Sequence, residues 1–395
     1  MRRTLTESAG LPTAVLWTLA IVAGISIANI YYIQPLLNII RKDLAVSEFA
    51  AGLIAMITQA GYALGLLFII PLGDLYQRKR IIVVDFIVLI SALLTFGFSQ
   101  HLATIMVASF LIGTCSVIPQ IFIPIAAQFS TPELKGRNIG IIISGLLTGI
   151  LASRVVSGLV GEWLGWRAMY FIAAGIMLTA LIVILKTMPE MESNFSGTYF
   201  KLMRSLKDLI RKYPDLIVVS VRSCLAFGSF LAMWSCLAFK MHQAPFYADS
   251  HIIGLLGLCG IVGALSASFV SRYAYKVGIK RFNIIGCLTM LSAWASFYWG
   301  EDSYLGIIAG IILIDIGLQC VQLSNQAIVF SLNPKASNRV NTIFMTTFFV
   351  GGSTGTLFGD IGWHLQEWHG VIVMGILLVL CSLSVTLFVR VQSKQ

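Results

Sequence analysis

Charged residues are scarce in this sequence. Only 11% of its 395 residues are Asp, Glu, Lys or Arg, and 57% are hydrophobic, whereas about a quarter of a typical soluble domain is charged. The mean hydropathy of +0.88 points the same way. This composition excludes an ordinary soluble domain and a disordered chain, and it indicates an integral membrane protein.

Metal-binding and nucleophilic motifs are also missing. The five histidines form no HExxH motif, and the seven cysteines lie inside apolar runs without a CxxC spacing. Zinc or di-metal chemistry needs such clusters, so we expect no metal, no cofactor and no disulfide. An intramembrane enzyme would need a nucleophile and base at depth, and no histidine is deep, so the sequence predicts a protein that is not an enzyme.

Long apolar runs are what the sequence has in abundance. A helix needs about 20 apolar residues to cross a bilayer. We therefore predict an all-α membrane protein with twelve transmembrane helices, the first of them an uncleaved span. The predicted spans are 12–40, 48–72, 81–98, 103–129, 137–162, 168–186, 215–240, 252–275, 281–299, 304–331, 341–364 and 370–390.

The net charge of +10 follows the membrane topology. With twelve spans, 21 of the 27 Lys and Arg residues lie on the side that carries both termini. The positive-inside rule makes that side cytoplasmic. The basic charge therefore reports orientation in a bilayer, and we expect no nucleic-acid partner.

A polar connection at 187–214 divides the chain into two halves of six spans. The halves are 1–186 and 215–395, and the connection has leucines at helical spacing, which predicts a short amphipathic helix on the cytoplasmic face. The halves align at an offset of 202 residues, which indicates an internal repeat with a binding site between the halves. The matched pairs are Gln120 with Gln322, Pro132 with Pro334, Arg137 with Arg339, Gly149 with Gly351, and Trp166 with Trp368.

The loop after the second span reads Pro71-Leu-Gly-Asp-Leu-Tyr-Gln-Arg-Lys-Arg80. It resembles the G-x-x-x-D-R-x-G-R-K/R loop of the major facilitator superfamily, with Asp74, Arg78, Lys79 and Arg80 matching and three other positions differing. This resemblance implies a gate in which Asp74 meets the N-terminal end of the eleventh helix, near Asn341 and Thr342. The alternative is that the basic residues only anchor the loop at the cytoplasmic face.

Further motifs narrow the resemblance within that superfamily. The fifth span has Gly136, Gly145 and Gly149, as drug antiporters of this fold do, but it lacks their Pro-Gly-Gly tail. The stretches 28–37, 144–154 and 314–326 resemble a bacterial branch grouped with the drug and sugar efflux permeases. The resemblance implies the major facilitator fold, two pseudo-symmetric six-helix bundles, in the cytoplasmic (inner) membrane of a bacterium.

Three ionisable residues lie deep inside predicted spans: Arg154, Arg222 and Asp315. An ionised residue at mid-membrane costs roughly 2.5–3.5 kcal/mol on insertion scales, so each needs a partner or a function. We expect Arg222 to pair with Asp315, with Arg154 reaching Asp315 in one access state or binding substrate. Asp315 is then a proton-coupling carboxylate, and the alternative is a static pair that fixes packing.

Polar and aromatic side chains at membrane depth predict a substrate cavity. Gln319, Gln322 and Gln326 share one helix face with Asp315. Some of the amides could instead form helix-to-helix hydrogen bonds. The candidate lining residues are Asn29, Tyr32, Gln120, Trp234, Gln319, Gln322, Asn325 and Gln326.

The first span contains the stretch SIANIYYIQPLL. Pro35 cannot bond the carbonyl of Tyr31, which predicts that this helix is bent or loosened near its outer end. We expect Asn29 and Tyr32 to contact substrate and Gln34 to satisfy the backbone that the proline frees.

The predicted function is proton-coupled export of a small amphipathic molecule by alternating access, without a cofactor. A proton-coupled importer of a small nutrient is the alternative, and a receptor of the same fold is less favoured because the buried charges are retained. Partners are the substrate, protons and the lipid bilayer, and the protein acts as a monomer. Two deep arginines against one deep acid favour neutral or anionic substrates.

Overall fold

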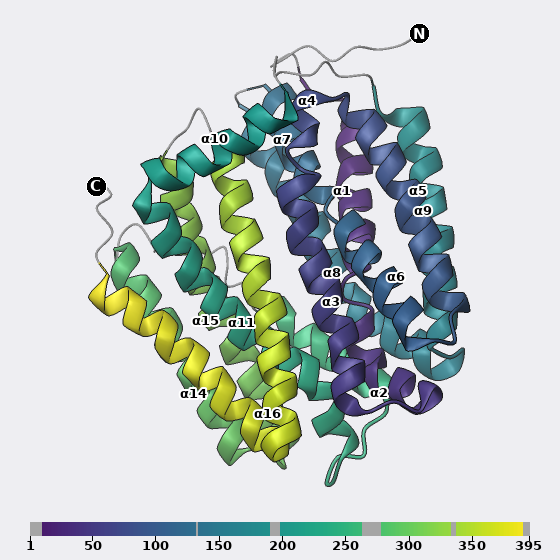
Figure 1. Cartoon of the computed structure of the whole chain (residues 1–395), viewed down its shortest axis with the longest axis vertical. Coiled ribbons are helices and arrows are strands. Elements are labelled where there is room, and N and C mark those ends of the chain that lie inside the picture. Colours follow the sequence, from purple (N-terminus) through teal and green to yellow (C-terminus); the bar gives the residue numbers. More distant parts are fainter. Residues whose placement is uncertain (1–9, 132, 190–197, 263–277, 333–336, 390–395) are drawn as a thin grey trace.

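The computed structural model describes residues 10–131, 133–189, 198–262, 278–332 and 337–389. Within these ranges the regular secondary structure is helical throughout (Figure 1). Nine helical stretches in them are long and apolar enough to cross a membrane, and the last of these contains two predicted spans. The all-α membrane fold predicted from the sequence is confirmed.

The first half of the chain forms the bundle drawn in purple and blue (Figure 1). Its helices are α1 (Thr13–Ala28), α2 (Ile33–Leu44), α3 (Glu48–Phe68), α4 (Leu72–Leu75), α5 (Arg78–Phe98), α6 (Leu102–Cys115), α7 (Pro119–Phe129), α8 (Lys135–Trp163) and α9 (Trp166–Thr187).

The connection between the halves contains α10 (Tyr199–Lys212), which lies across one end of the molecule, and the second half forms the bundle drawn from teal through green to yellow (Figure 1). The elements of the second half are α11 (Pro214–His242), α12 (Ser250–Leu256), a 3-10 turn (Gly257–Cys259), α14 (Ile279–Trp299), α15 (Tyr304–Leu332) and α16 (Ser337–Phe388). The predicted span 252–275 is helical as far as Val262, and the rest of it lies outside the described residues.

Two of the predicted spans are interrupted. The first span stops at Ala28 and resumes at Ile33, two residues before Pro35, so the helix is loosened near the proline as predicted. The fourth span divides into α6 and α7, and Pro119 occupies the first turn of α7, where its missing N–H costs nothing. Helix α16 contains two predicted spans. They are separated at Gln366 and Glu367, whose backbone is not helical, with Glu367 at φ 48°.

The two tryptophans matched by the internal repeat, Trp166 and Trp368, pack in the same way. Trp166 meets the ring of Phe96 edge-on at 5.7 Å between centroids, and Trp368 meets Phe297 at 5.7 Å in the same way. Each tryptophan follows a residue with positive φ, Gly165 or Glu367. The same aromatic contact therefore fixes the turn between the fifth and sixth spans of each half.

Glycine contacts also recur. A side chain on Gly149 would lie 2.1 Å from the carbonyl oxygen of Gly24, and one on Gly355 would lie 2.0 Å from that of Gly228. Helix α8 thus crosses α1 backbone to backbone, and α16 crosses α11 in the same manner. Small residues permit this close approach.

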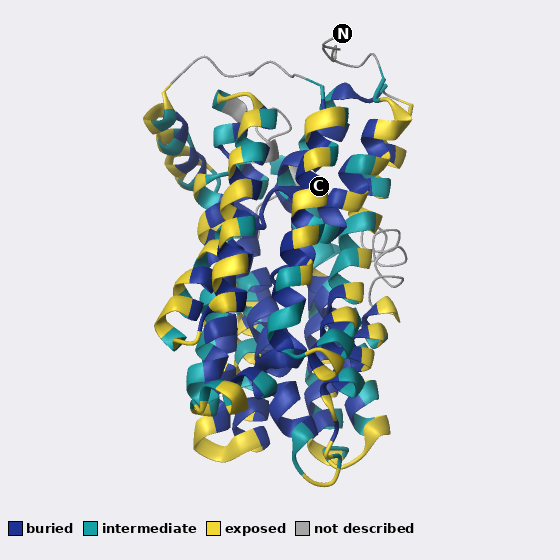
Figure 2. Cartoon of the chain, turned by 90° about the vertical axis from the view of Figure 1, so that its right-hand side faces the viewer, coloured by how far each residue is buried: buried dark blue, intermediate teal, exposed yellow. Residues whose placement is uncertain are grey.

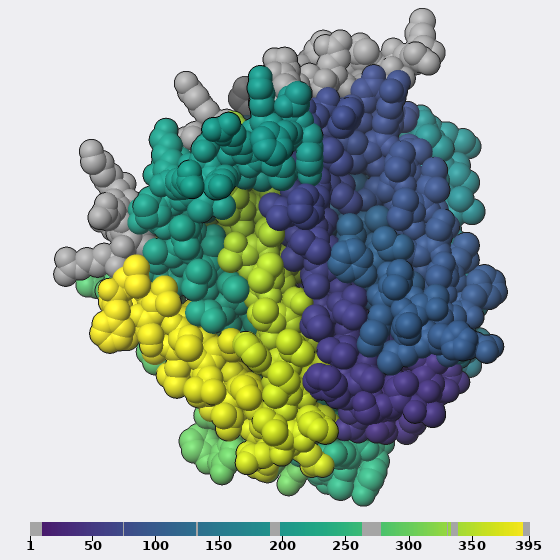
Figure 3. All heavy atoms as spheres, viewed as in Figure 1, coloured from purple at the N-terminus to yellow at the C-terminus, as the bar shows by residue number. Residues whose placement is uncertain are grey.

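The halves lie side by side along α3 and α16, which run next to each other down the front face (Figure 3). The Ser353 hydroxyl donates to the Met56 carbonyl at 3.2 Å across this contact. Buried residues gather inside the bundles and exposed ones on their outer surfaces (Figure 2). We call the end with α4 and α10 the α10 end, and the opposite end, with the C-terminus of α2 and the start of α12, the α2 end.

Candidate functional site

Arg154 is the centre of the candidate site. It lies on α8 with 3% of its surface exposed. Its Nε donates to Gln34 Oε1 at 2.8 Å, and its guanidinium lies 4.1 Å from the ring centroid of Trp234 and 5.1 Å from that of Tyr31. Aromatic faces stabilise a cation by about 2 kcal/mol or more when it is desolvated. Residues from α2, from α11 and from the break between α1 and α2 therefore hold this charge in place.

Asp315, on α15, faces the same region from the second half. Its Oδ2 is buried and makes no hydrogen bond with a described residue, and it lies 3.7 Å from the place of a side chain on Gly260. The charges of Arg154 and Asp315 interact electrostatically, but no direct ion pair joins them. Arg154 from the first half and Asp315 from the second half thus face the same region without forming an ion pair.

The predicted pairing of Arg222 with Asp315 is wrong in this structure. The Arg222 guanidinium instead donates to the carbonyls of Val385 at 3.3 Å and Val389 at 2.7 Å. These carbonyls end α16, and a cation at a helix C-terminus is stabilised by the helix dipole and by the unpaired carbonyl groups. Arg222 therefore secures the last helix, and Arg154 is the arginine that faces Asp315.

The break in the first span was placed correctly, but its side chains take other roles. Asn29 donates to the carbonyls of Ile25 and Ser26 in its own helix, so it satisfies the backbone at the break. Gln34, predicted to do this, binds Arg154 instead. Tyr31 contacts Arg154, whereas Tyr32, predicted to contact substrate, is not among the described residues that stack on Arg154; both tyrosines are buried. The i, i+3 spacing of Tyr31 and Gln34 was the signal that could have identified this face.

Two more of the predicted lining residues are Gln120, on α7, and Trp234, on α11. The Gln120 amide donates to the Tyr62 hydroxyl at 3.5 Å, and the Tyr62 ring packs 4.2 Å from that of Phe349 on α16. Trp234 is buried, and its indole N–H has no hydrogen-bond partner among the described residues. This indole N–H, on the ring that Arg154 stacks against, can therefore donate a hydrogen bond to a bound molecule.

The amides of α15 divide into two groups. Gln319, Gln322 and Gln326 are half-buried, and Gln326 donates to Asn341 at 3.2 Å. Asn325 is fully buried and donates to Ser223 at 3.1 Å and to Asn283 at 2.9 Å. The prediction that Asn325 lines the cavity is therefore wrong, because it joins α11, α14 and α15 within the second half.

The basic residues of the predicted gating loop make specific contacts. Arg78 is buried and donates to Gly73 O at 3.3 Å and to Gln128 at 2.8 Å. Lys79 donates to the carbonyls of Leu185 and Met188 at the end of α9, and Arg80 is exposed. The side chain of Asp74, on α4, lies outside the described part of the structure.

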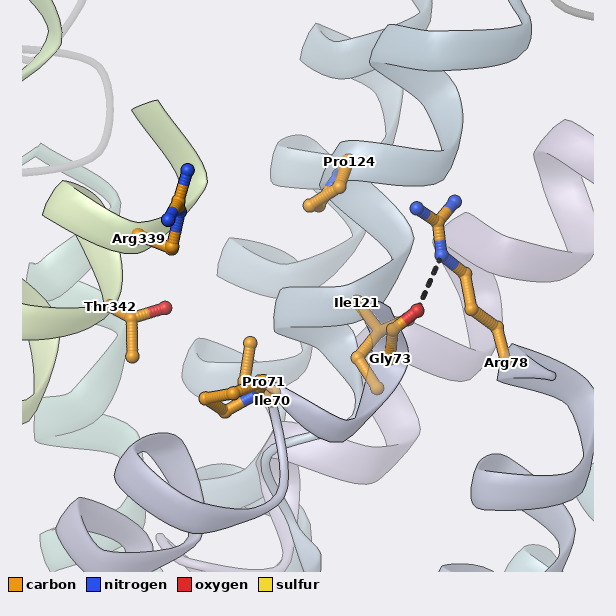
Figure 4. Close-up of a pocket in the computed structure, with 8 residues that line it drawn as sticks. All are labelled: Ile70, Pro71, Gly73, Arg78, Ile121, Pro124, Arg339 and Thr342. Atoms are coloured by element: carbon orange, nitrogen blue, oxygen red, sulfur yellow. Dashed lines mark hydrogen bonds between the residues drawn. The ribbon is translucent and has the colours of Figure 1, made fainter. Parts of the chain in front are cut away.

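A cavity of about 30 Å³ lies beside this loop at the α10 end. Figure 4 shows Arg339 and Thr342 of α16 on one side and Pro71, Gly73 and Ile121 on the other. The loop after α3 thus faces the start of α16 across a space large enough for water.

The halves meet directly at the α2 end. Trp363 Nε1 on α16 donates to Glu48 Oε2 on α3 at 2.6 Å, and His251 Nδ1 on α12 lies 2.5 Å from Glu162 Oε2 on α8. Glu48 also pairs with Arg41 at 2.9 Å. Polar contacts from two helix pairs therefore close this end.

One group of possible metal ligands occurs among the described residues. Glu162, Asp249 and His251 place ligand atoms within 4.8 Å of one another at the α2 end. Glu162 and Asp249 are exposed, and His251 already contacts Glu162. We therefore interpret this group as a polar contact between the halves.

Two helical halves facing each other across a buried cation and acid define the class of protein: a membrane transporter with a central site. Comparison with known proteins agrees. The family profile of the Major Facilitator Superfamily matches residues 19–356. The chain is 34% identical over 375 residues to the uncharacterised transporter YgaY of Escherichia coli O157:H7, covering 95% of each chain.

Other relatives extend this result. The chain is 21% identical to a probable sugar efflux transporter of Helicobacter acinonychis, covering 83% of each chain. It resembles a bacterial homologue of the human lysosomal transporter Spinster with a TM-score of 0.76 and 13% identity, covering 94% of each. For the nucleoside transporter NupG the TM-score is 0.73, with 14% identity, covering 94% of this chain and 99% of that one. The chain belongs to the Major Facilitator Superfamily, as the sequence predicted.

Proposed function

We propose that this transporter is a proton-coupled exporter of small amphipathic molecules in the bacterial cytoplasmic membrane, with the α10 end cytoplasmic. The observation that carries the proposal is the pair of charges Arg154 and Asp315, which come from opposite halves and interact without an ion pair. Binding a proton at Asp315 changes the charge that Arg154 faces. A movement of the halves changes the same interaction, so the two events are coupled.

The surroundings of Arg154 support a substrate with both apolar and polar groups. Trp234 and Tyr31 offer aromatic surface, and Gln319 and Gln322 offer amides that are not committed to described hydrogen-bond partners. With Arg222 engaged at the end of α16, Arg154 is the deep cation that faces Asp315 between the halves, which favours neutral or anionic substrates over lipophilic cations.

Replacing Asp315 tests the coupling. A substrate is first found by thermal-shift screening of the purified protein against sugars, siderophores, organic acids and cationic dyes. In proteoliposomes, Asp315→Asn is expected to lose proton-driven accumulation of that substrate while keeping substrate exchange, because only the proton site is removed. Proton-driven accumulation equal to wild type would refute the coupling role.

A further inference from the structure

Asp360 is a second buried acid between the halves, apart from the Arg154 site. It lies on α16 with 2% of its surface exposed, one helical turn before Trp363. Its carboxyl group rests on the backbone of α3: a side chain on Gly52 would lie 2.1 Å from Asp360 Oδ2 and 2.4 Å from Oδ1. Only a glycine at this position lets the acid fit between the two helices.

Among the described residues, no cation pairs with Asp360. On α11, the Cys236 thiol donates to Asp360 Oδ1 at 3.7 Å, and the Lys240 ammonium pairs with Asp302 at 3.3 Å instead of with Asp360. On α3, Glu48, itself an acid, lies one helical turn before Gly52, on which Asp360 rests. Asp360 Oδ2 makes no hydrogen bond with a described residue.

The remaining neighbours pack through their rings and form no ion pair with Asp360. His364, one turn further along α16, packs its ring against Phe49 at 6.3 Å. Helix α14 meets α16 beyond the break, at Trp368 and Gly375, through aromatic side chains. Burying an ionised carboxylate without a cation costs much more free energy than burying the neutral acid. The neutral form of Asp360 is therefore favoured in these surroundings.

We propose that Asp360 is a second protonation site, whose neutral form holds the α2 end closed and whose ionised form opens it. When α3 and α16 separate at this end, the carboxyl group reaches water and can release its proton. Closing the end requires the proton again. This inference rests on the proposed alternating access, and it adds a proton-operated gate that is separate from Asp315.

The direction of this linkage agrees with proton-driven export. If the α2 end faces the outside, a proton taken up there closes that end and returns the empty transporter toward the cytoplasm. One proton bound in the closed state and absent in the open state changes the closed-to-open ratio by up to tenfold per pH unit.

The test measures opening of the α2 end without a substrate. Spin labels on Gln100→Cys and Ser303→Cys, exposed residues near this end of the two halves, report the distance between the halves by electron spin resonance in nanodiscs from about pH 5 to 9. The other cysteines are replaced except Cys236, which is buried and contacts Asp360. In the parent protein the closed-to-open ratio is expected to fall as pH rises.

Four variants separate the possibilities. Asp360→Asn and Asp360→Ser should stay closed at high pH and lose one proton from the pH slope, up to tenfold per unit. Asp315→Asn should keep the Asp360 contribution. Asp85→Asn is the matched control, because Asp85 is equally buried, at 5% exposed, but lies on α5 within the first half, and it should behave as the parent.

An unchanged pH slope in both Asp360 variants would overturn the inference, and so would a parent protein whose closed-to-open ratio ignores pH. Neither result bears on Asp315, whose role is judged by proton-driven accumulation. Loss of accumulation in Asp315→Asn together with an unchanged slope in Asp360→Asn would keep the proposed function and remove the second site.

Discussion

At the scale of single residues, the site depends on an arginine that aromatic rings and one amide hold in place. Arg154 stacks on Trp234 and donates through Nε to Gln34, so its planar guanidinium fixes the orientation of the charge. A lysine ammonium is a compact, strongly hydrated charge that cannot reproduce this stacking and fork geometry. The charge alone is therefore insufficient at this position.

We expect Arg154→Lys to weaken substrate binding by roughly tenfold, because a lysine ammonium keeps the charge but cannot be oriented by stacking on Trp234 and by the Nε bond to Gln34. Binding is measured by thermal shift against the substrate found in the screen. Arg80→Lys, at an exposed position, is the control and should bind as wild type does. Equal affinity in the two variants would contradict the site described here.

At the scale of helices, close crossings at glycine hold each half together. Gly149 on α8 touches the backbone of α1, whereas Gly140 on the same helix has nothing within 4 Å of where a side chain would begin. The two positions differ in packing and not in backbone conformation, since both are helical.

Gly149→Ala should lower the melting temperature, because the added methyl would collide with the Gly24 carbonyl and force α1 and α8 apart. Gly140→Ala should leave it unchanged or raise it slightly, since alanine favours a helix by up to about 1 kcal/mol over glycine. Thermal unfolding in one detergent compares the two variants. A lower melting temperature for Gly140→Ala alone would show that the crossing contributes little.

At the scale of the whole molecule, polar contacts at the α2 end join the halves, while at the α10 end a cavity of about 30 Å³ lies between the loop after α3 and the start of α16. The indole of Trp363 donates to Glu48 at 2.6 Å, a hydrogen bond to a charged group that is worth about 1.5–3 kcal/mol. This contact belongs to the closed arrangement of that end.

Trp363→Phe should therefore shift the halves toward the open arrangement by roughly tenfold in population, since phenylalanine keeps the ring and removes the donor. The spin-label distance between the loops at the α2 end measures the shift. Trp299→Phe, at an exposed tryptophan, is the matched control. Equal distance distributions in the two variants would show that the bond does not hold this end closed.

Much of the fold followed from the sequence because membrane insertion imposes strong local rules. Run length predicted the helices, Pro35 predicted the break in the first span, and the motifs predicted the family. The site was predicted less well. Arg154 and Asp315 were recognised as deep charges, but the pairing of Arg222 and the roles of Gln34 and Asn325 were not.

The reason is physical. The sequence by itself determined which segments cross the membrane and which charges lie at depth, since both depend on neighbouring residues and the thickness of the bilayer. Only the tertiary structure decided which charge meets which partner, because Arg222 had the end of α16 within reach and Arg154 had Trp234, Tyr31 and Gln34. It also decided that Asp360 rests on Gly52, a contact between residues more than three hundred positions apart that no local pattern encodes.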